Sequence, residues 1–269
     1  MFAFFNDAFV PVEKAALPYS DLAVNRGYGI FDFFKTINGK PVFLEEHLER
    51  FYDSASQMRL PVAYQLPELK TLLLELINRN GLSYSGVRLT LTGGSSPDGY
   101  SIGKPNFIIS QQALSPITRE KIDEGIRLLT VEHQRQLPAI KTIDYLMPVW
   151  LQPQLQQAGA DDMLYHQNNL VTECPRANFF ILTADGKIAT PKTGILQGII
   201  RRKVLNIAQT SMTVEERNIS LQEILSAKEA FITSTTKGVL PVSAIDGKQI
   251  GTGSRESSTI LLQKLEALY

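Results

Sequence analysis

The sequence predicts an α/β (α+β) protein of two domains, and three observations lead to this prediction. Segments rich in aromatic and β-branched residues alternate with segments whose apolar residues recur every three or four positions, as in helices. The length of 269 residues is enough for two modest domains. A polar segment with Pro116 divides the chain, so we expect an N-terminal domain over 1–114, a linker over 115–124 and a C-terminal domain over 125–269. A surface loop within one domain would have the same composition, so that alternative stays open.

The N-terminal half starts its strong patterns at residues 28–37, whose aromatic and β-branched side chains predict a strand. Asn38-Gly39 is a strong signal for a hairpin turn, so residues 41–44 are expected to form the return strand. Residues 45–58 place apolar side chains along one stripe, which predicts a helix. The same criteria predict a helix over 67–79 and strands over 87–92 and 106–110.

The C-terminal half alternates predicted strands and helices. A helix is expected over about 144–157 and another over 198–208, and Ser220 with Glu223 forms a capping-box pattern that starts a short one. A closing helix is expected over 258–268. Strands are expected over 125–131, 162–165, 179–183, 187–190 and 230–233.

The charge balance excludes several classes of partner. Lysine plus arginine (27) equals aspartate plus glutamate (27), so no overall field attracts nucleic acid or an anionic membrane. We therefore expect a small-molecule partner or a second copy of the chain. The N-terminus lacks a basic segment before an apolar run, and no apolar stretch reaches the roughly 18 residues of a membrane-spanning helix.

Cysteine and histidine usage indicates a cytoplasmic protein without a metal site. The only cysteine, Cys174, excludes an intrachain disulfide and fits a reducing compartment. The three histidines have no metal-ligand spacing with that cysteine, so we expect no bound metal.

Two residues, a lysine and a glutamate that follows it in the chain, indicate the chemistry. Lys141 is followed 32 residues later (173 − 141) by Glu173. Chemistry with pyridoxal 5'-phosphate (PLP) needs a lysine amine to form a Schiff base with the aldehyde and a carboxylate to keep the pyridine nitrogen protonated. A solvated lysine and a surface carboxylate are the ordinary interpretation of either residue alone.

Further motifs accompany this pair in a fixed order along the chain. They are Arg26–Asp32, His47–Ala55, Thr172-Glu173, Gly198-Ile199, Phe231–Thr236 and Pro241–Gly247. With these motifs the chain resembles the class IV (fold type IV) PLP-dependent aminotransferases. That superfamily includes branched-chain and D-amino-acid aminotransferases and aminodeoxychorismate lyase, and the resemblance covers nearly the whole chain.

The resemblance implies a two-domain fold with PLP in the interdomain cleft, in a homodimer whose neighbouring subunit completes the site. Lys141 would be the Schiff-base lysine and would also move the proton on the substrate Cα. Glu173 would pair with the pyridine nitrogen. Tyr145 would contact the 3'-oxygen of the cofactor, although a buried aromatic on a helix face is an equal alternative.

The resemblance also implies a phosphate site. The pattern His-x-x-Arg assigns Arg50 to the phosphate, where a guanidinium forms charge-assisted hydrogen bonds. The helix expected to begin at Gly198 would offer the backbone N–H groups of Ile199 and Ile200. Ser234 and Thr235 would add donors. Ile200 departs from the pattern, since many relatives have threonine there, so one hydroxyl contact is missing.

The substrate side is less determined. Arg88 and Arg26 are alternative anchors for the substrate carboxylate, and Arg26 is equally well explained as a solvated loop charge. Phe31 and Tyr28 would give an apolar, aromatic pocket that favours a hydrophobic side chain, and the alternative is that they belong only to the core. Thr236, beside the phosphate hydroxyls, is a further candidate for contact with the substrate.

Differences from the motifs of related enzymes reduce the number of reactions to be considered. D-amino-acid enzymes carry tyrosine at the position of Phe31 and arginine at the position of Gly93, which argues against their carboxylate trap. The loop 94–101 resembles that of the lyase, but Phe31-Asp-Phe33 replaces its Phe-Thr-Thr. We therefore expect ping-pong transamination between a branched-chain or other hydrophobic amino acid and a 2-oxo acid. The alternatives are a lyase that releases pyruvate and 4-aminobenzoate, and a non-catalytic PLP-binding homologue.

Overall fold

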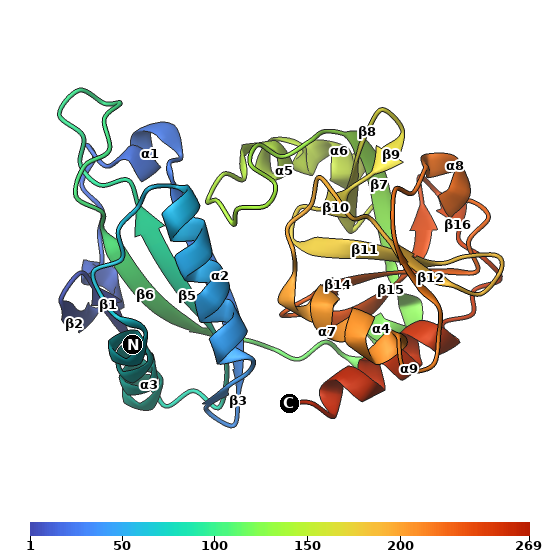
Figure 1. Ribbon diagram of the computed structural model, residues 1–269, viewed down its shortest axis with the longest axis horizontal. Helices are drawn as coiled ribbons and strands as arrows, with labels where there is room; N and C mark the ends of the chain where they lie inside the picture. The colour runs from blue at the N-terminus through green and yellow to red at the C-terminus, as the bar shows by residue number, and fades with distance from the viewer. The chain divides into compact units, whose positions relative to one another are not determined.

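The computed structural model describes residues 1–269, which form two compact units (Figure 1). Unit 1 contains Met1–Ser115 and the short segment Ile140–Asp144, and unit 2 contains Pro116–Ala139 and Tyr145–Tyr269. The chain thus leaves unit 1 after Ser115, returns to it for a short segment, and then completes unit 2. No helix is both long and apolar enough to cross a membrane.

Unit 1 is built on a six-stranded antiparallel sheet in the order β2-β1-β6-β5-β3-β4. Its strands are β1 (Phe2–Phe5), β2 (Ala8–Pro11), β3 (Gly29–Ile37), β4 (Lys40–Pro41), β5 (Tyr84–Thr92) and β6 (Phe107–Ala113). Its helices are η1 (Val12–Lys14), α1 (Leu22–Arg26), α2 (Leu44–Gln57) and α3 (Leu66–Asn80). The β3–β4 hairpin turns at Asn38 and Gly39, whose φ angles of 52° and 73° confirm the predicted turn.

The core of unit 1 lies between this sheet and the helices α2 and α3, which pack on it (Figure 1). Leu48 and Phe51 of α2 are fully buried, as the apolar stripe of that helix predicts. They meet Ile30 and Phe34 of β3 in one hydrophobic cluster. This packing fixes β3, the strand on which most of the predicted site residues of unit 1 depend.

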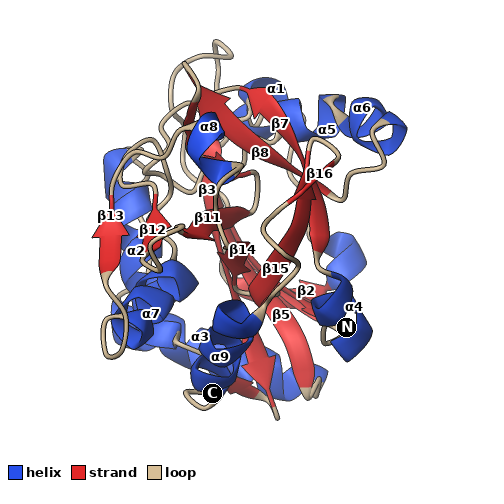
Figure 2. Cartoon of the chain, turned by 90° about the vertical axis from the view of Figure 1, so that its right-hand side faces the viewer, coloured by secondary structure: helices blue, strands red, loops and turns tan.

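Unit 2 contains a mixed ten-stranded sheet with the path β13-β12-β11-β14-β15-β7-β8-β9, while β10 pairs with β11 and β16 with β15. The strands are β7 (Ile126–Glu132), β8 (Asp162–Gln167), β9 (Leu170–Val171), β10 (Glu173–Cys174), β11 (Ala177–Leu182), β12 (Ile188–Thr190), β13 (Val214–Glu216), β14 (Glu229–Ser234), β15 (Gly238–Ile245) and β16 (Lys248–Gln249). The helices are α4 (Arg119–Glu124), α5 (Leu146–Trp150), α6 (Gln152–Gln157), α7 (Ile199–Ala208), α8 (Leu221–Ile224) and α9 (Glu256–Glu266). Helices α7 and α9 lie next to each other and pack against β14 (Figure 2).

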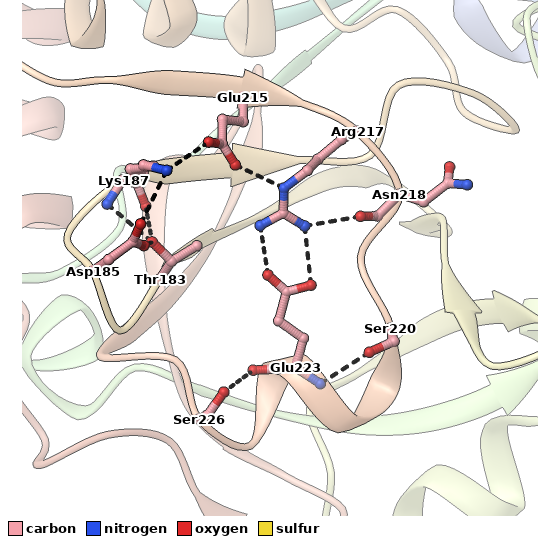
Figure 3. Close-up of polar contacts among 9 residues, drawn as sticks. All are labelled: Thr183, Asp185, Lys187, Glu215, Arg217, Asn218, Ser220, Glu223 and Ser226. Atoms are coloured by element: carbon pink, nitrogen blue, oxygen red, sulfur yellow. Dashed lines mark hydrogen bonds and ion pairs between the residues drawn. The ribbon is translucent and has the colours of Figure 1, made fainter.

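An ion-pair network at the β12–β13 edge of unit 2 reaches α8 (Figure 3). Arg217 donates to Glu215 at 2.8 Å and to both carboxylate oxygens of Glu223. Lys187 adds a 3.0 Å ion pair to Glu215. Ser220 accepts from the backbone N–H of Glu223 at 3.1 Å, which confirms it as the N-cap of α8. These partly exposed pairs order the edge of the sheet and contribute little stability individually.

Several predicted boundaries were wrong. The expected linker over 115–124 is helical from Arg119 onward, because Thr118 caps this helix by accepting from the backbone N–H of Lys121. The single helix expected over 144–157 is two short helices, α5 and α6, that meet at Leu151. The short strands β2, β9, β10, β13 and β16 and the long strand β15 escaped prediction.

Candidate functional site

Lys141 lies in unit 1, although the division predicted from the sequence puts it in the C-terminal domain. Two backbone hydrogen bonds attach its segment to β3: the Phe31 N–H donates to the Lys141 carbonyl at 2.9 Å, and the Ile143 N–H donates to the Gly29 carbonyl at 3.1 Å. Ile140 is buried in the core of unit 1. Strand pairing and the burial of Ile140 therefore bring this segment into unit 1.

Two positively charged side chains of unit 1 lie near one aromatic ring. The Lys141 Nζ atom lies 4.4 Å from the centroid of the Phe31 ring, and the Arg88 guanidinium lies 4.2 Å from the same centroid. Phe31 is buried and Arg88 is exposed. An aromatic ring attracts cations through its negative face, so the Phe31 ring stabilises each of these positive groups. The amine of the Ile140–Asp144 segment thus meets an apolar surface of β3 and a guanidinium of β5.

The predicted phosphate arginine is held by a buried carboxylate. Arg50 donates from Nε and Nη2 to the two oxygens of Asp32 at 2.8 and 2.9 Å, a bidentate arrangement. His47 Nδ1 lies 2.7 Å from Asp32 Oδ1. Asp32 and His47 are buried, whereas the Arg50 side chain keeps 14% of its exposure. One edge of the guanidinium is therefore committed to Asp32, and Asp32 fixes its orientation.

The charges of this cluster follow from its burial and its pairing. Burial alone would raise the pKa of Asp32, but the interactions with Arg50 and His47 together outweigh burial and hold that pKa well below its usual range. Burial lowers the pKa of His47, although the Asp32 carboxylate opposes this effect. Because an ionised carboxylate only accepts hydrogen bonds, the neutral His47 carries its proton on Nδ1 and donates it to Asp32.

Two other predicted residues of unit 1 have contacts of their own. The Tyr28 hydroxyl donates to the Met58 carbonyl at 2.7 Å, and its ring packs on the hydrophobic core, so this side chain helps to hold α2. Arg26 is exposed at the end of α1 and donates to the Asn25 carbonyl at 2.9 Å.

In unit 2, Glu173 begins the short strand β10, and only 5% of its side chain is exposed. Arg135 donates from Nε to Glu173 Oε1 at 2.8 Å. The backbone N–H of Leu196 donates to Oε2 at 2.9 Å. A buried carboxylate with such donors stays ionised and keeps one orientation, as a partner for a protonated ring nitrogen must.

Unit 2 also presents the N-terminus of α7. Gly198 is its N-cap, and Ile199 and Ile200 are its first residues. A Cβ atom on residue 198 would lie 2.1 Å from the Asn178 Oδ1 atom, so the glycine allows Asn178 to approach the helix start. Glycine supplies no capping side chain, and the backbone N–H groups of the first turn offer a site for an anion.

The predicted hydroxyl donors follow β14. Ser234 ends this strand, and its hydroxyl accepts from the Lys237 N–H at 3.2 Å, while Thr235 and Thr236 form the turn to β15. Asn178, next to Gly198, pairs with Thr233 across β11 and β14. Strand pairing therefore brings this turn and the start of α7 to the same region of unit 2.

Tyr145 and Cys174 are the remaining residues of unit 2 to be located. Tyr145 is the half-buried N-cap of α5, and its carbonyl accepts from the Val149 N–H at 3.2 Å. Cys174 is buried, and burial raises the pKa of its thiol well above the ordinary value. A neutral, enclosed thiol is a poor nucleophile.

The predicted site residues thus fall into two sets, one on each unit. Their chemistry fits PLP: a lysine amine and an arginine on unit 1, and a buried carboxylate, a helix N-terminus and hydroxyl groups on unit 2. The sequence patterns gave no role to Asp32, Arg135 or Asn178. Asp32 stands in one of the motifs, but Arg135 and Asn178 carry no signal, because only the fold brings them to Glu173.

The chain has relatives among known proteins. The family model described as amino-transferase class IV matches residues 29–245. D-alanine aminotransferase of Bacillus licheniformis is 30% identical over 255 residues, which are 93% of this chain and 90% of that protein. A putative branched-chain-amino-acid aminotransferase of Methanocaldococcus jannaschii is 30% identical over 259 residues, which cover 92% of this chain and 88% of that protein.

Solved structures share the fold. A branched-chain amino acid aminotransferase from T.th. with pyridoxamine 5'-phosphate has a TM-score of 0.92 and 26% identity, over 99% of this chain and 93% of that one. A putative 4-amino-4-deoxychorismate lyase of Legionella pneumophila has a TM-score of 0.86 and 26% identity, over 94% of this chain and 96% of that one. These likenesses confirm the predicted fold class.

From the pKa shifts of Asp32 and His47 we predict that the folded protein loses stability as the pH falls. For both residues the pKa is lower in the folded chain than in the unfolded chain, so the unfolded chain binds the proton more readily. The contribution of His47 is complete above about pH 6.5 and falls below it, and that of Asp32 falls below about pH 4. We expect His47→Gln to flatten the decrease in melting temperature between about pH 6.5 and 5. His133→Gln is the matched control and keeps the slope; equal profiles for His47→Gln and wild type would contradict the assignment.

Proposed function

Because the chain belongs to the class IV aminotransferase family and uses PLP, we propose that it transfers an amino group between a hydrophobic amino acid of the branched-chain type and a 2-oxo acid. The observation that carries this proposal is the arrangement on β3 and β5. There the Lys141 amine and the Arg88 guanidinium lie within 4.4 Å of the centroid of the buried Phe31 ring.

The chemistry of the lysine follows from its surroundings. PLP, when bound, supplies an aldehyde for an amine and a ring that withdraws electrons from the substrate Cα. The Lys141 Nζ atom would be the nucleophile for that aldehyde, and as a free amine it would accept the proton from the substrate Cα and deliver it to the C4′ carbon of the cofactor. The half-buried position of Lys141 beside Phe31 limits access of water to this amine.

The cofactor would be held by groups from both units. Arg50, oriented by Asp32, binds the phosphate together with the Ile199 and Ile200 N–H groups. Ser234 and Thr235 add hydroxyl donors to the phosphate, and Tyr145 donates to the 3'-oxygen. Glu173 pairs with the ring nitrogen.

The substrate carboxylate is assigned to Arg88. This guanidinium shares the Phe31 ring with Lys141, whereas Arg26 contacts the Asn25 carbonyl at the end of α1. A guanidinium binds a carboxylate through two parallel hydrogen bonds. Thr236 is the proposed additional donor. The Phe31 ring forms the apolar wall against which a branched side chain packs.

The space around Gly93 supports a branched-chain rather than a D-amino-acid carboxylate site. A Cβ atom on residue 93 would lie 2.9 Å from both Leu22 Cβ and Tyr28 Cδ1. The arginine that D-amino-acid enzymes carry at this position would require a shift of the buried Leu22 and of α1. Relatives named D-alanine aminotransferase make the D-enantiomers a necessary part of every substrate test.

The lyase is the second candidate function. Its support is the likeness to the putative 4-amino-4-deoxychorismate lyase, together with the loop 94–101. Both reactions use the same lysine and differ in the substrate. Release of pyruvate without an added 2-oxo acid distinguishes the lyase from the transaminase.

A homodimer in the cytoplasm is the proposed state of the enzyme. Helix α5 exposes Leu146, Val149 and Trp150, which are 72%, 66% and 65% accessible. A row of large apolar residues in water marks an interaction surface, and a second copy of a charge-balanced chain is a suitable partner. The single buried cysteine, Cys174, fits a reducing compartment.

We expect purified protein mixed with PLP to develop the visible absorbance band of lysine-bound cofactor. Leucine, valine, isoleucine and methionine, each tested as both enantiomers, should discharge this band, and a 2-oxo acid should restore it. Lys141→Ala should lack the band and lose about 10³-fold or more of kcat. Lys192→Ala, which changes an exposed lysine, is the control and keeps both. A band that persists in Lys141→Ala would refute the central assignment, and discharge only by aminodeoxychorismate with pyruvate release would favour the lyase.

The carboxylate anchor is tested by two arginine variants. Arg88→Gln should raise KM for the amino donor roughly 10- to 100-fold, because a charged hydrogen-bonding partner of the carboxylate is lost. Arg26→Gln should change KM by less than about 3-fold, as expected for an exposed charge. Steady-state kinetics with both substrates measures these values. A large effect in Arg26→Gln with none in Arg88→Gln would transfer the anchor to Arg26.

The dimer surface is tested through the only tryptophan, Trp150. We expect its fluorescence to shift to longer wavelength on dilution, as the side chain becomes exposed to water, and sedimentation should show a dimer becoming a monomer. Trp150→Glu should sediment as a monomer. Ile260→Glu, which changes an exposed apolar residue on α9, is the control and stays dimeric. A wild-type monomer at all concentrations would disprove the dimer, and a dimeric Trp150→Glu would place its interface elsewhere.

A further inference from the structure

Arg135 forms an enclosed ion pair with Glu173, one of the predicted site residues of unit 2. The Arg135 Nε–Glu173 Oε1 distance is 2.8 Å, and 14% and 5% of the two side chains are exposed. Arg135 Nη2 also donates to the Pro138 carbonyl at 2.7 Å. The guanidinium is therefore fixed between the carboxylate and the backbone of the segment that leads to Lys141.

The other oxygen of Glu173 is anchored as well. Oε2 accepts from the Leu196 N–H at 2.9 Å and lies 3.4 Å from Asn178 Nδ2. Asn178 Nδ2 donates in turn to the Leu196 carbonyl at 2.8 Å. Donors from three separate segments thus set the orientation of one carboxylate, and the segment containing Leu196 continues into α7.

Keeping a buried carboxylate such as Glu173 ionised costs free energy unless a permanent cation lies beside it. An ionised group away from water favours neutralisation by a proton unless a charged partner compensates. A guanidinium does not lose its proton in proteins, so Arg135 compensates Glu173 at every working pH. The charge of Glu173 therefore exists before any ligand arrives.

We propose that Arg135 is a positioning residue that keeps Glu173 ionised and aimed, so that the proton between this carboxylate and a cofactor ring nitrogen stays on the nitrogen. The proposal rests on the proposed role of Glu173 and goes beyond it. The proton can sit on Glu173 or on the ring nitrogen, and no other group gains or loses it. Because the guanidinium lies against the carboxylate, a proton on the nitrogen is farther from the positive charge than one on Glu173.

The first test uses the protein without cofactor. Arg135→Gln leaves Glu173 buried without its cation and should lower the melting temperature by about 5 °C or more. Adding Glu173→Gln removes the unpaired charge, so the double variant should recover part of the loss. Arg217→Gln is the matched control (Figure 3): it breaks an arginine–glutamate pair of the same unit, and Glu173→Gln should not compensate for it.

The second test observes the ring nitrogen directly, with PLP labelled with ¹⁵N at that position. The ¹⁵N chemical shift of wild-type holoenzyme should report a protonated nitrogen, and that of Arg135→Gln a largely unprotonated one. Arg135→Lys keeps the charge but loses the planar fork, so its nitrogen should stay protonated. The Kd for pyridoxamine 5'-phosphate should rise roughly 10-fold or more in Arg135→Gln and less in Arg135→Lys. Arg217→Gln should match wild type in both measurements.

The outcomes separate this inference from the function it rests on. A protonated nitrogen in Arg135→Gln with the wild-type Kd would overturn the role of Arg135 and leave the aminotransferase intact. If Arg135→Gln does not fold, an unprotonated nitrogen in Arg135→Lys would equally overturn it, because the charge is retained there. A wild-type protein without any cofactor signal would refute the proposed function, and the role of Arg135 with it.

Discussion

The position of Lys141 depends on two backbone hydrogen bonds between its segment and β3, from Phe31 and to Gly29. The short segment Ile140–Asp144 is the only part of the second half of the chain that belongs to unit 1. Without this pairing, Lys141 would lie on a connection with no fixed neighbour. At Gly29 a Cβ atom would lie 2.9 Å from the Leu91 carbonyl oxygen of β5 and 3.0 Å from Ile143 Cδ1, so the glycine lets β5 and the Lys141 segment both approach β3 closely. Most of the other proposed chemistry of unit 1 is arranged around the same strand.

Each unit contains a buried carboxylate paired with an arginine. In one pair the carboxylate supports the arginine, and in the other the arginine supports the carboxylate. In unit 1 Asp32 is the supporting group, and Arg50 keeps an exposed edge for the proposed phosphate. In unit 2 Arg135 is the supporting group, and Glu173 is the group proposed to face the ligand. Loss of the supporting residue removes what fixes the orientation of the other residue in both pairs. Loss of Arg135 also removes the positive charge that compensates Glu173. Binding groups and their supports therefore have to be identified pair by pair.

Sequence patterns predicted the elements with a strong periodicity and a clear turn, such as α2 and the β3–β4 hairpin. They missed the two-residue strands β9, β10 and β16, because such short strands form through pairing with neighbours rather than through the preferences of their own residues. They also missed the eight-residue strand β15. The family resemblance supplied Lys141 and Glu173. Sequence patterns could not identify Arg135 as the partner of Glu173, because the two residues are 38 positions apart in sequence and only the sheet of unit 2 brings them together.

The division of the site explains how one fold serves relatives named for different reactions. The proposed ring and phosphate groups of unit 2, Glu173 and the start of α7, act on parts of the cofactor that every reaction shares. The side chains proposed to meet the substrate, Phe31 and Arg88, lie on β3 and β5 of unit 1. A change of substrate then requires changes around these two strands, where Gly93 limits what fits. Specificity can diverge in unit 1 while the groups on unit 2 stay the same, because the two sets belong to different sheets.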